Sequence, residues 1–347
     1  VPRVRLVDAV PVLAGLGAAV VLVPWWTATR GPRALATLLA GWDHSAHFSM
    51  TEMIRRHGVT VDLLPVADGW KFADYPQGFH TSIATVMDLA NPALGAPGQE
   101  VVRYVQAQSV VLIGAGVLVA AGVCTLPWLR RRPGVALVAA AASVAPLLLA
   151  PGGAAVDAGF ANFVLGAAMV LMLLQLSVGI GRSGSPIALL AAAGLVVAIA
   201  HAWVLLLTLA APAALPLVRP ALRRAHRPAV MSALVVAVAG TLLGLAHTGW
   251  VLRRLDPTEV LVIPGAVLAP DPGTVLAVAL FAAAACLAAG PRLRVVTLVP
   301  LVALGVAAAL ATFQLATGGD LTYYFWKYLL GVQLVGAGVL AVSASRL

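Results

Sequence analysis

Charged residues are scarce in this chain: Asp, Glu, Lys and Arg make up only 10% of its 347 residues. A soluble globular protein has about 25% charged and about 45–50% apolar residues. Here 61% of the residues are hydrophobic and the mean hydropathy is +0.98. A single water-soluble core could not bury that much apolar surface. The sequence therefore excludes an ordinary soluble domain and predicts a protein embedded in lipid.

Cysteine is also rare, and both cysteines, Cys124 and Cys286, fall inside apolar stretches. This excludes a disulfide framework and a cysteine-based metal site, and we expect both side chains to pack as small hydrophobes. A net charge of +9 could suggest a nucleic-acid partner. However, the basic residues lie in short loops between apolar runs and no nucleic-acid-binding module is visible, so we expect no such partner.

Long apolar runs make up most of the sequence. A helix needs about 20 apolar residues to cross the hydrocarbon. The runs that approach this length are Leu6–Trp26, Val102–Pro127, Gly134–Leu149, Gly159–Ile180, Pro186–Val218, Ala229–Val251, Thr274–Ala289, Val295–Phe313 and Tyr323–Val342. Pro186–Val218 is too long for one crossing and short for two.

The distribution of charge resolves this run. If it forms two helices that turn near His201, one side of the membrane receives every acidic residue except Asp8. The other side then receives Arg3, Arg5, Arg130, Arg131, Arg132, Arg182, Arg219, Arg223, Arg224, Arg227, Arg292, Arg294 and Arg346. The positive-inside rule makes that side cytoplasmic. We therefore predict an all-α, polytopic protein of the cell membrane with about ten helices and both ends in the cytoplasm.

The prediction places residues 1–347 in a single transmembrane domain. No small-residue cleavage site follows the first apolar run, so we interpret it as a span and not as a signal peptide. The chain begins at Val1 without Met and ends at Leu347 shortly after an apolar run, which is compatible with a fragment of a longer protein.

The longest outward loop, Thr27–Glu100, carries Asp43, Glu52, Asp62, Asp68, Asp74, Asp88 and Glu100. A loop of this length in a compact protein usually has structure and a function of its own. A second outward loop, Arg253–Pro272, is rich in proline, and we expect it to be extended or coiled.

The first loop contains two predicted helices. One begins near Asp43, a good N-cap, and stops at Gly58. This register places Asp43 and His47 one turn apart on one face, with His44 adjacent. The other begins at Asp74-Tyr75-Pro76, includes His80 and runs to about Ala90, with Pro76 near its first turn.

Each of these residues also has a structural interpretation. Asp43 could simply cap its helix, and Tyr75-Pro76 could be only a turn. His44, His47 and His80 could be packed histidines, and a metal pair at His44 and His47 has no supporting motif. The dense grouping of these residues with Asp74 beside a membrane favours catalysis, because a carboxylate there can serve as general base for a polar acceptor.

Two features inside apolar runs have the same two interpretations. His201 lies in the middle of such a run, where an ionisable group is a functional candidate. The last span opens with Tyr323, Tyr324 and Lys327. These could be an aromatic belt with a snorkelling lysine. Lys327 could equally bind a phosphate just inside the outer leaflet.

The order of these motifs resembles the GT-C superfamily of membrane glycosyltransferases, and is most similar to actinobacterial GT-C-like proteins. The resemblance rests on an Asp-x-x-x-His helix (Asp43 to His47), a Tyr-Pro-x-Gly-x-His pattern (Tyr75 to His80) and a late Tyr-Tyr-x-x-Lys pattern (Tyr323 to Lys327). It spans nearly the whole chain, although each motif is short.

The resemblance implies a GT-C-like fold and transfer of a sugar from a polyprenyl-phosphate donor to a glycan or glycolipid acceptor outside the cytoplasm. It implies that Asp43 is the general base and that Lys327, with His201, neutralises the lipid phosphate. The remaining candidates for substrate binding are His44, His47, Asp74, Tyr75, His80, Tyr323 and Tyr324. Some members use a divalent cation, which Asp43 with Asp74 or Glu52 could hold, and the sequence leaves this open.

Two other functions stay open at this point. A transporter or flippase for a lipid-linked sugar would commonly show inverted repeats and polar groups at the bilayer midplane. No internal repeat is visible, and the polar groups cluster at one face. The other alternative is a non-catalytic protein that assembles cell-envelope enzymes. The donor sugar, the acceptor and the linkage cannot be inferred from the sequence.

Overall fold

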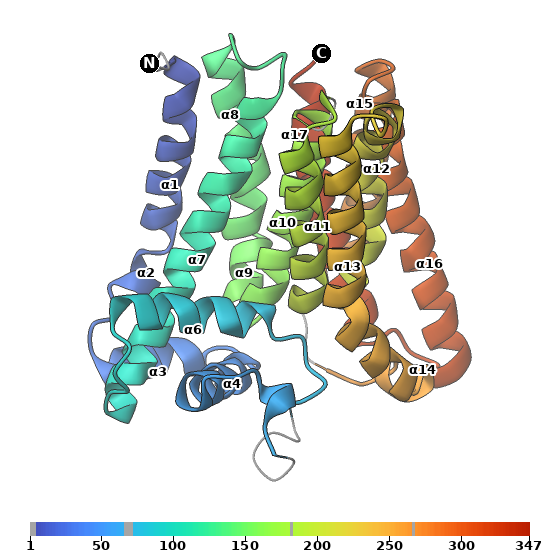
Figure 1. Ribbon diagram of the computed structural model, residues 1–347. Helices are drawn as coiled ribbons and strands as arrows, with labels where there is room; N and C mark the ends of the chain where they lie inside the picture. The colour runs from blue at the N-terminus through green and yellow to red at the C-terminus, as the bar shows by residue number, and fades with distance from the viewer. Residues whose placement is uncertain (1–4, 66–71, 181–182, 266–267) are drawn as a thin grey trace.

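The computed structural model describes residues 5–65, 72–180, 183–265 and 268–347. Within these ranges it is helical and contains no strand. The long helices stand side by side in one bundle, and shorter helices lie across one end (Figure 1). The α-helices are α1 (Val10–Val21), α2 (Val23–Trp26), α3 (Gly31–Leu39), α4 (His44–His57), α6 (Gly78–Ala90), α7 (Pro97–Thr125), α8 (Pro133–Leu148), α9 (Gly152–Asp157), α10 (Ala161–Val178), α11 (Pro186–Ala202), α12 (Leu207–Arg223), α13 (Pro228–Arg254), α14 (Pro257–Val260), α15 (Pro272–Ala288), α16 (Leu298–Gly318) and α17 (Tyr323–Ala344).

Seven helical segments in the described part of the chain are long and apolar enough to cross a membrane. Three shorter apolar helices, Leu6–Val21, Pro186–Ala202 and Pro272–Ala288, stand beside them. The chain therefore has the architecture of a multi-pass helical membrane protein. The count of about ten crossings and the GT-C class of the fold stay predictions.

The long run Pro186–Val218 is broken as predicted. Helix α11 ends at Ala202, one residue after His201, and α12 begins at Leu207. Trp203 between them has extended backbone angles, and Val204–Leu206 form a short 3-10 turn. The two helices run in opposite directions, so Arg219–Arg227 return to the end of the bundle where α1 begins.

Charge is separated between the two ends of the bundle. Helix α1 begins and α17 ends at the same end, and the α7–α8 and α12–α13 connections lie there too (Figure 1). The α7–α8 connection carries the arginine cluster 130–132, and the cluster 219–227 spans the last turns of α12 and the α12–α13 connection. Apart from Asp8, which precedes α1, the acid-bearing segments lie at the opposite end, as the helix directions require. Arg3, Asp68 and Arg182 lie outside the described residues.

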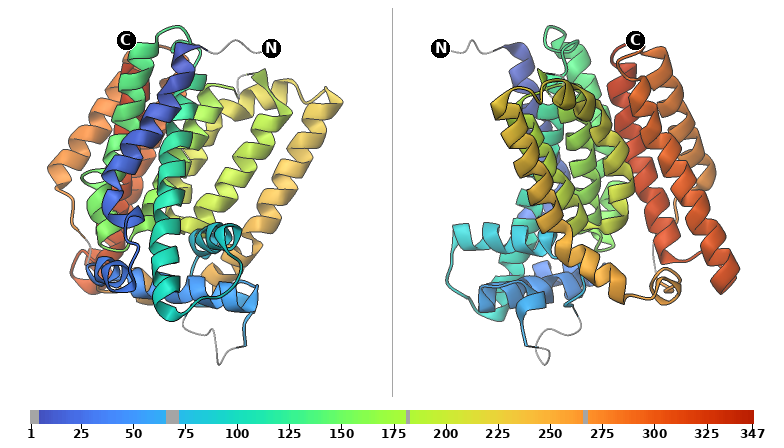
Figure 2. Two further views of the ribbon diagram at one scale, coloured as in Figure 1. Left: turned by 90° about the vertical axis from the view of Figure 1, so that its left-hand side faces the viewer. Right: turned by 45° about the vertical axis from the view of Figure 1, so that its right-hand side comes forward.

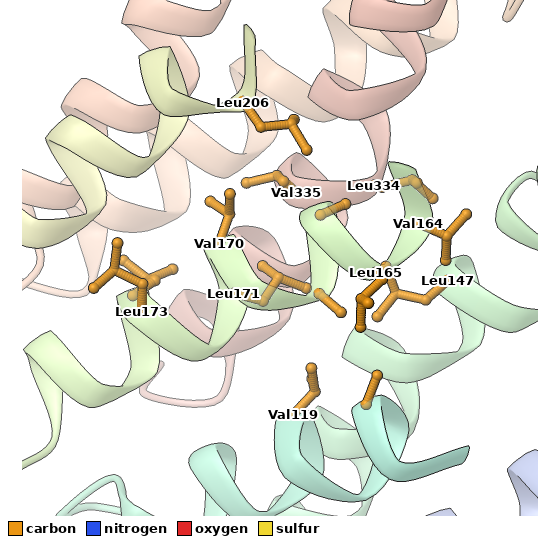
Figure 3. Packing of buried hydrophobic residues seen from close by; sticks show 14 of the residues in the cluster. Val119, Leu147, Val164, Leu165, Val170, Leu171, Leu173, Leu206, Leu334 and Val335 are labelled. Atoms are coloured by element: carbon orange, nitrogen blue, oxygen red, sulfur yellow. The ribbon is translucent and has the colours of Figure 1, made fainter. Parts of the chain in front are cut away.

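The bundle is centred on α10 and α17. Their most apolar windows are 83% and 78% buried, whereas that of α13 is only 17% buried, so α13 stands at the edge. Side chains from α7, α8, α10, α17 and the α11–α12 connection interlock in the core (Figure 3). Those labelled are Val119, Leu147, Val164, Leu165, Val170, Leu171, Leu173, Leu206, Leu334 and Val335.

The predicted first loop is more helical than expected. Helices α3, α4 and α6 lie across the end of the bundle (Figures 1 and 2), and α3 was not predicted. Helix α4 is terminated by Gly58, as predicted, and the φ of 70° at Gly58 is the left-handed conformation that favours glycine. The predicted start of the second helix was wrong, because α6 begins at Gly78 and Asp74–Pro76 precede it. Glu100 belongs to α7, which starts at Pro97.

The other boundaries need smaller corrections. The first apolar run is divided at Leu22 into α1 and α2. The second outward loop is not simply extended, since α13 continues to Arg254 and α14 adds a helical turn at Pro257–Val260. Two of the four prolines that suggested coil, Pro257 and Pro272, stand at the first positions of α14 and α15, where the missing N–H costs no hydrogen bond. Pro264 and Pro270 lie in irregular backbone, as expected.

A buried ion cluster fixes α4 to its neighbours. The Arg55 side chain is 1% exposed and its Nε donates to Asp88 Oδ1 on α6 at 2.8 Å. It also pairs with Glu100 on α7 and donates to the Asn91 carbonyl oxygen at 3.1 Å. Glu100 in turn accepts from Arg103 at 2.8 Å. One arginine therefore joins α4 to α6 and to α7.

Replacing Arg55 should destabilise the protein strongly. Arg55→Ala removes one of the two basic partners of the buried Glu100 and leaves Arg103 as the other. Breaking a buried ion pair costs up to about 3–5 kcal/mol when the remaining charge has no other partner, so we expect a loss below that range. We expect a clearly lower Tm in detergent. The matched control is Arg56→Ala, because Arg56 is 57% exposed and pairs with Glu52 on the surface. Equal losses of Tm for the two variants would contradict a special role for Arg55.

Candidate functional site

A cavity of about 760 Å³ lies at the end of the bundle covered by the first loop. Its walls come from the turn before α6, the ends of α11 and α13, and the start of α17. Among its lining residues are Asp74, Tyr75, His201, Tyr323, Tyr324 and Lys327. Six of the ten predicted site residues, from three separate parts of the chain, therefore share one cavity.

Lys327 lies in the cavity wall, yet its side chain has no exposed surface. Its Nζ lies 4.4 Å from the centre of the Phe160 ring, 4.8 Å from that of Tyr323 and 5.6 Å from that of Trp203. The faces of these rings attract a cation. Nζ also donates a hydrogen bond to the Tyr323 hydroxyl, one helical turn away.

Asp43 lies behind the same tyrosine. The Tyr323 hydroxyl is within reach of the Asp43 carboxylate, and the Lys327 charge is close enough to attract it. Burial raises the pKa of the Asp43 carboxyl above its usual 3.8, although Lys327 and Tyr323 oppose this. The acid and the cation are thus joined through a single phenol.

Asp43 is available for this contact because it does not cap its helix. It occupies the position before α4, but its side chain makes no capping hydrogen bond. The helix start is held by the turn before α10 instead: Trp42 N donates to the Ala158 carbonyl oxygen at 3.1 Å. Gly159 in this turn has a φ of 100°, and a Cβ there would approach Asp43 N to 2.8 Å. The capping interpretation of Asp43 is therefore wrong.

The Tyr-Pro-x-Gly-x-His segment meets α10 and α11. The Tyr75 hydroxyl accepts a hydrogen bond from Asn162 Nδ2 at 3.0 Å, and burial raises the pKa of Tyr75. A Cβ at Gly78 would approach His201 Cβ to 2.9 Å, so only glycine allows this contact without a shift. His201 Nε2 lies 3.0 Å from the Gly244 carbonyl oxygen on α13. These contacts fix the cavity wall formed by α6 and α11.

The three remaining histidines lie beside the cavity and are not among its lining residues. His47 Nδ1 is 2.7 Å from His80 Nε2, and both rings are buried. Burial lowers the pKa of His80 to about 3 and that of His47 well below 6.5, so the pair is neutral near pH 7. His44 packs against Trp25 and its Nε2 lies 3.2 Å from the Asp157 carbonyl oxygen.

Sequence reasoning missed the contribution of the α9–α10 junction. Phe160 and Phe163 surround Lys327, and Asn162 holds Tyr75. Asn162 carried a usable signal, because it is a lone amide near the start of an apolar run, where polar groups need partners. The two phenylalanines carried no such signal, since aromatic residues occur in apolar runs for packing alone.

No three His, Cys, Asp or Glu side chains gather as metal ligands anywhere in the described part of the chain. Of the acids considered for a cation, Glu52 accepts from Arg56 at 2.6 Å. Asp43 is engaged by Tyr323 and Lys327. These residues do not form a metal site in this arrangement.

Comparison with known proteins adds no identification: no protein family, no curated protein and no solved structure matches the chain.

The buried histidine pair should make the protein acid-sensitive. Burial lowers the pKa of His80 from its usual 6.5 to about 3 in the folded protein, so between these pH values the unfolded state binds more protons. The contribution of neutral His80 to the free energy of unfolding should therefore be fully present above pH 6.5. It should be lost progressively as the pH decreases toward 3. We expect the Tm of His80→Asn to fall less steeply between pH 7 and pH 4 than that of the wild type.

The exposed His226 provides the control, because His226→Asn makes the same replacement away from the pair. Its pH dependence should match the wild type. An unchanged slope for His80→Asn would contradict the assignment of acid sensitivity to the buried pair.

Proposed function

We propose that the chain is a membrane glycosyltransferase of the GT-C type. It would move a sugar from a polyprenyl-phosphate donor to a glycan or lipid of the cell envelope. One observation carries the proposal: Asp43 and Lys327 meet through Tyr323 beside a large cavity at one end of a membrane bundle. A cation in the cavity wall and a carboxylate just behind that wall match the two charges that develop when a sugar leaves a phosphate.

In this proposal Asp43 is the general base. It takes the proton from the acceptor hydroxyl, whose oxygen then bonds to the anomeric carbon of the sugar. The bond from that carbon to the phosphate oxygen breaks, and polyprenyl phosphate leaves with the electron pair. The raised pKa of Asp43 supports this role, because a stronger base accepts the proton more readily.

Lys327 receives the developing phosphate charge. A preorganised cation in a poorly hydrated site stabilises such a charge far more than one in water does. Because Lys327 has no exposed surface, a phosphate reaches it only after the neighbouring tyrosine side chains move apart. Apolar residues such as Val197, Val251 and Leu252 line the cavity and suit a prenyl chain.

The charge separation supports the orientation. With the arginine-rich end in the cytoplasm, the cavity opens on the extracytoplasmic face of the cell membrane. A polyprenyl phosphate keeps its chain in the lipid and its phosphate at that surface, where Lys327 stands.

The transferase accounts for the site better than a transporter does. A transporter binds its substrate near the bilayer midplane between structural repeats. Here the cavity is at one end of the bundle and includes loop residues such as Thr60 and Asp74. A non-catalytic assembly protein would have no use for a carboxylate held beside a buried cation.

The decisive variant is Asp43→Asn, which keeps the shape of the side chain and removes its basicity. We expect the purified variant to bind a polyprenyl-phosphate sugar with wild-type affinity and to lose at least about 100-fold in transfer rate. For the wild type, transfer should fall as the pH decreases through the raised pKa of Asp43, above 3.8. The measurement is sugar transfer from a labelled donor to a cell-envelope acceptor, followed across pH.

Asp157→Asn is the matched control, because Asp157 is an exposed acid on the adjacent turn that interacts with Trp25 and not with Tyr323 or Lys327. It should transfer at the wild-type rate. Undiminished transfer by Asp43→Asn would exclude Asp43 as the base, and a wild type that binds no such donor would exclude the transferase.

A further inference from the structure

A second cavity, of about 420 Å³, lies at the opposite end of the bundle from the candidate site. It is bounded by the end of α10, the last turns of α12 and the segment after α15. Helix α12 separates the two cavities along its length, which is about 25 Å at 1.5 Å per residue. Its lining residues are Val178, Leu215, Pro216, Arg219, Pro220, Arg223, Arg224, Pro291, Arg292 and Val295.

Four of these residues are arginines and none is acidic. Arg219 and Arg223 stand one turn apart on α12, and Arg292 reaches the same hollow from the segment after α15. Among the residues that the structure describes, these three form no ion pair with a carboxylate. Like charges one turn apart on a helix repel each other. An anion seated between them would remove that repulsion.

The hollow also has an apolar side. Leu215 and Val295, on two different segments, are 41% and 40% exposed, and Val178 lies between the helices. Along α12 the sequence changes from apolar residues up to Val218 to arginines from Arg219 onward. The cavity therefore straddles the level where the apolar surface of the bundle gives way to its charged end.

The positive-inside rule explains why arginines lie at this end, but it requires no hollow. Exposed arginines that line no cavity would satisfy the rule equally well. Arg130 and Arg131 in the α7–α8 connection are examples. Convergence of arginines from two segments on one concavity is a further feature. Guanidinium groups present a planar set of donors that matches phosphate oxygens in pairs.

We propose that this cavity binds the phosphate group of an anionic membrane lipid. The arginines take the phosphate, and the acyl chains lie against Leu215 and Val295. The apolar side favours a lipid over free phosphate, since a soluble anion has no use for it. Basic pockets between membrane helices bind lipid headgroups by the same chemistry. The inference does not depend on the proposed transferase activity.

The test compares retention of lipids by the full chain, purified in a neutral detergent. Native mass spectrometry measures how much added phosphatidylglycerol and phosphatidylcholine stays bound. We expect the wild type to retain phosphatidylglycerol preferentially. Arg219→Gln with Arg223→Gln should weaken that retention roughly tenfold, since each basic residue near the headgroup contributes to binding.

The matched control is Arg130→Gln with Arg131→Gln, which removes the same charge from the same end of the bundle outside the cavity. It should retain phosphatidylglycerol as the wild type does. An equal loss in both double variants would overturn the proposal by showing that general electrostatic attraction binds the lipid. Equal retention of phosphatidylcholine and phosphatidylglycerol by the wild type would overturn it as well.

A separate titration uses inorganic phosphate with lipid-free protein and follows the Tm. If the ligand is a lipid, millimolar phosphate should not raise the Tm of the wild type more than that of the double variant. A rise in Tm that disappears in Arg219→Gln with Arg223→Gln, without preferential lipid retention, would show that the cavity binds soluble phosphate. That result would overturn the proposal of a lipid ligand.

Discussion

The arrangement of the candidate site depends on the burial of one ammonium group. An ionised amine removed from water loses several kcal/mol of hydration that the protein must replace. Lys327 meets this requirement with the faces of Phe160 and Tyr323, the Tyr323 hydroxyl and the charge of Asp43. These groups come from α17, the α9–α10 junction and the start of α4. The fold of the covering loop is thus tied to the charge at the end of the bundle.

The loop, in turn, is held in place by a second buried charge. Arg55 is nearly inaccessible and joins three helices through Asp88, Asn91 and Glu100. The α4 helix is therefore fixed at both ends, by the glycine turn at Gly159 near its start and by the arginine cluster near its finish. A helix fixed in this way holds Asp43 in position without using the carboxylate as a cap.

Much of the bundle could be predicted from the sequence, because lipid imposes simple rules on length and charge. The break after His201 followed from the placement of arginines alone. The start of α6 could not be predicted, because Pro76 is equally acceptable in a turn and in a first helical turn. The contact of Asp43 with Tyr323 joins residues far apart in the chain, and no local pattern encodes it. The phenylalanines around Lys327 could not be predicted for the same reason, because they are also far from Lys327 in the sequence.

The peripheral position of α13 has a consequence for the side of the cavity that faces the lipid. This helix supplies His247, Val251 and Leu252 to the cavity wall, yet it packs mainly against α11 and is buried less than the other spans. On this side a single peripheral helix therefore stands between the cavity and the surrounding lipid. The polar site at one end of the bundle and the apolar surroundings of its helices are only one helix apart.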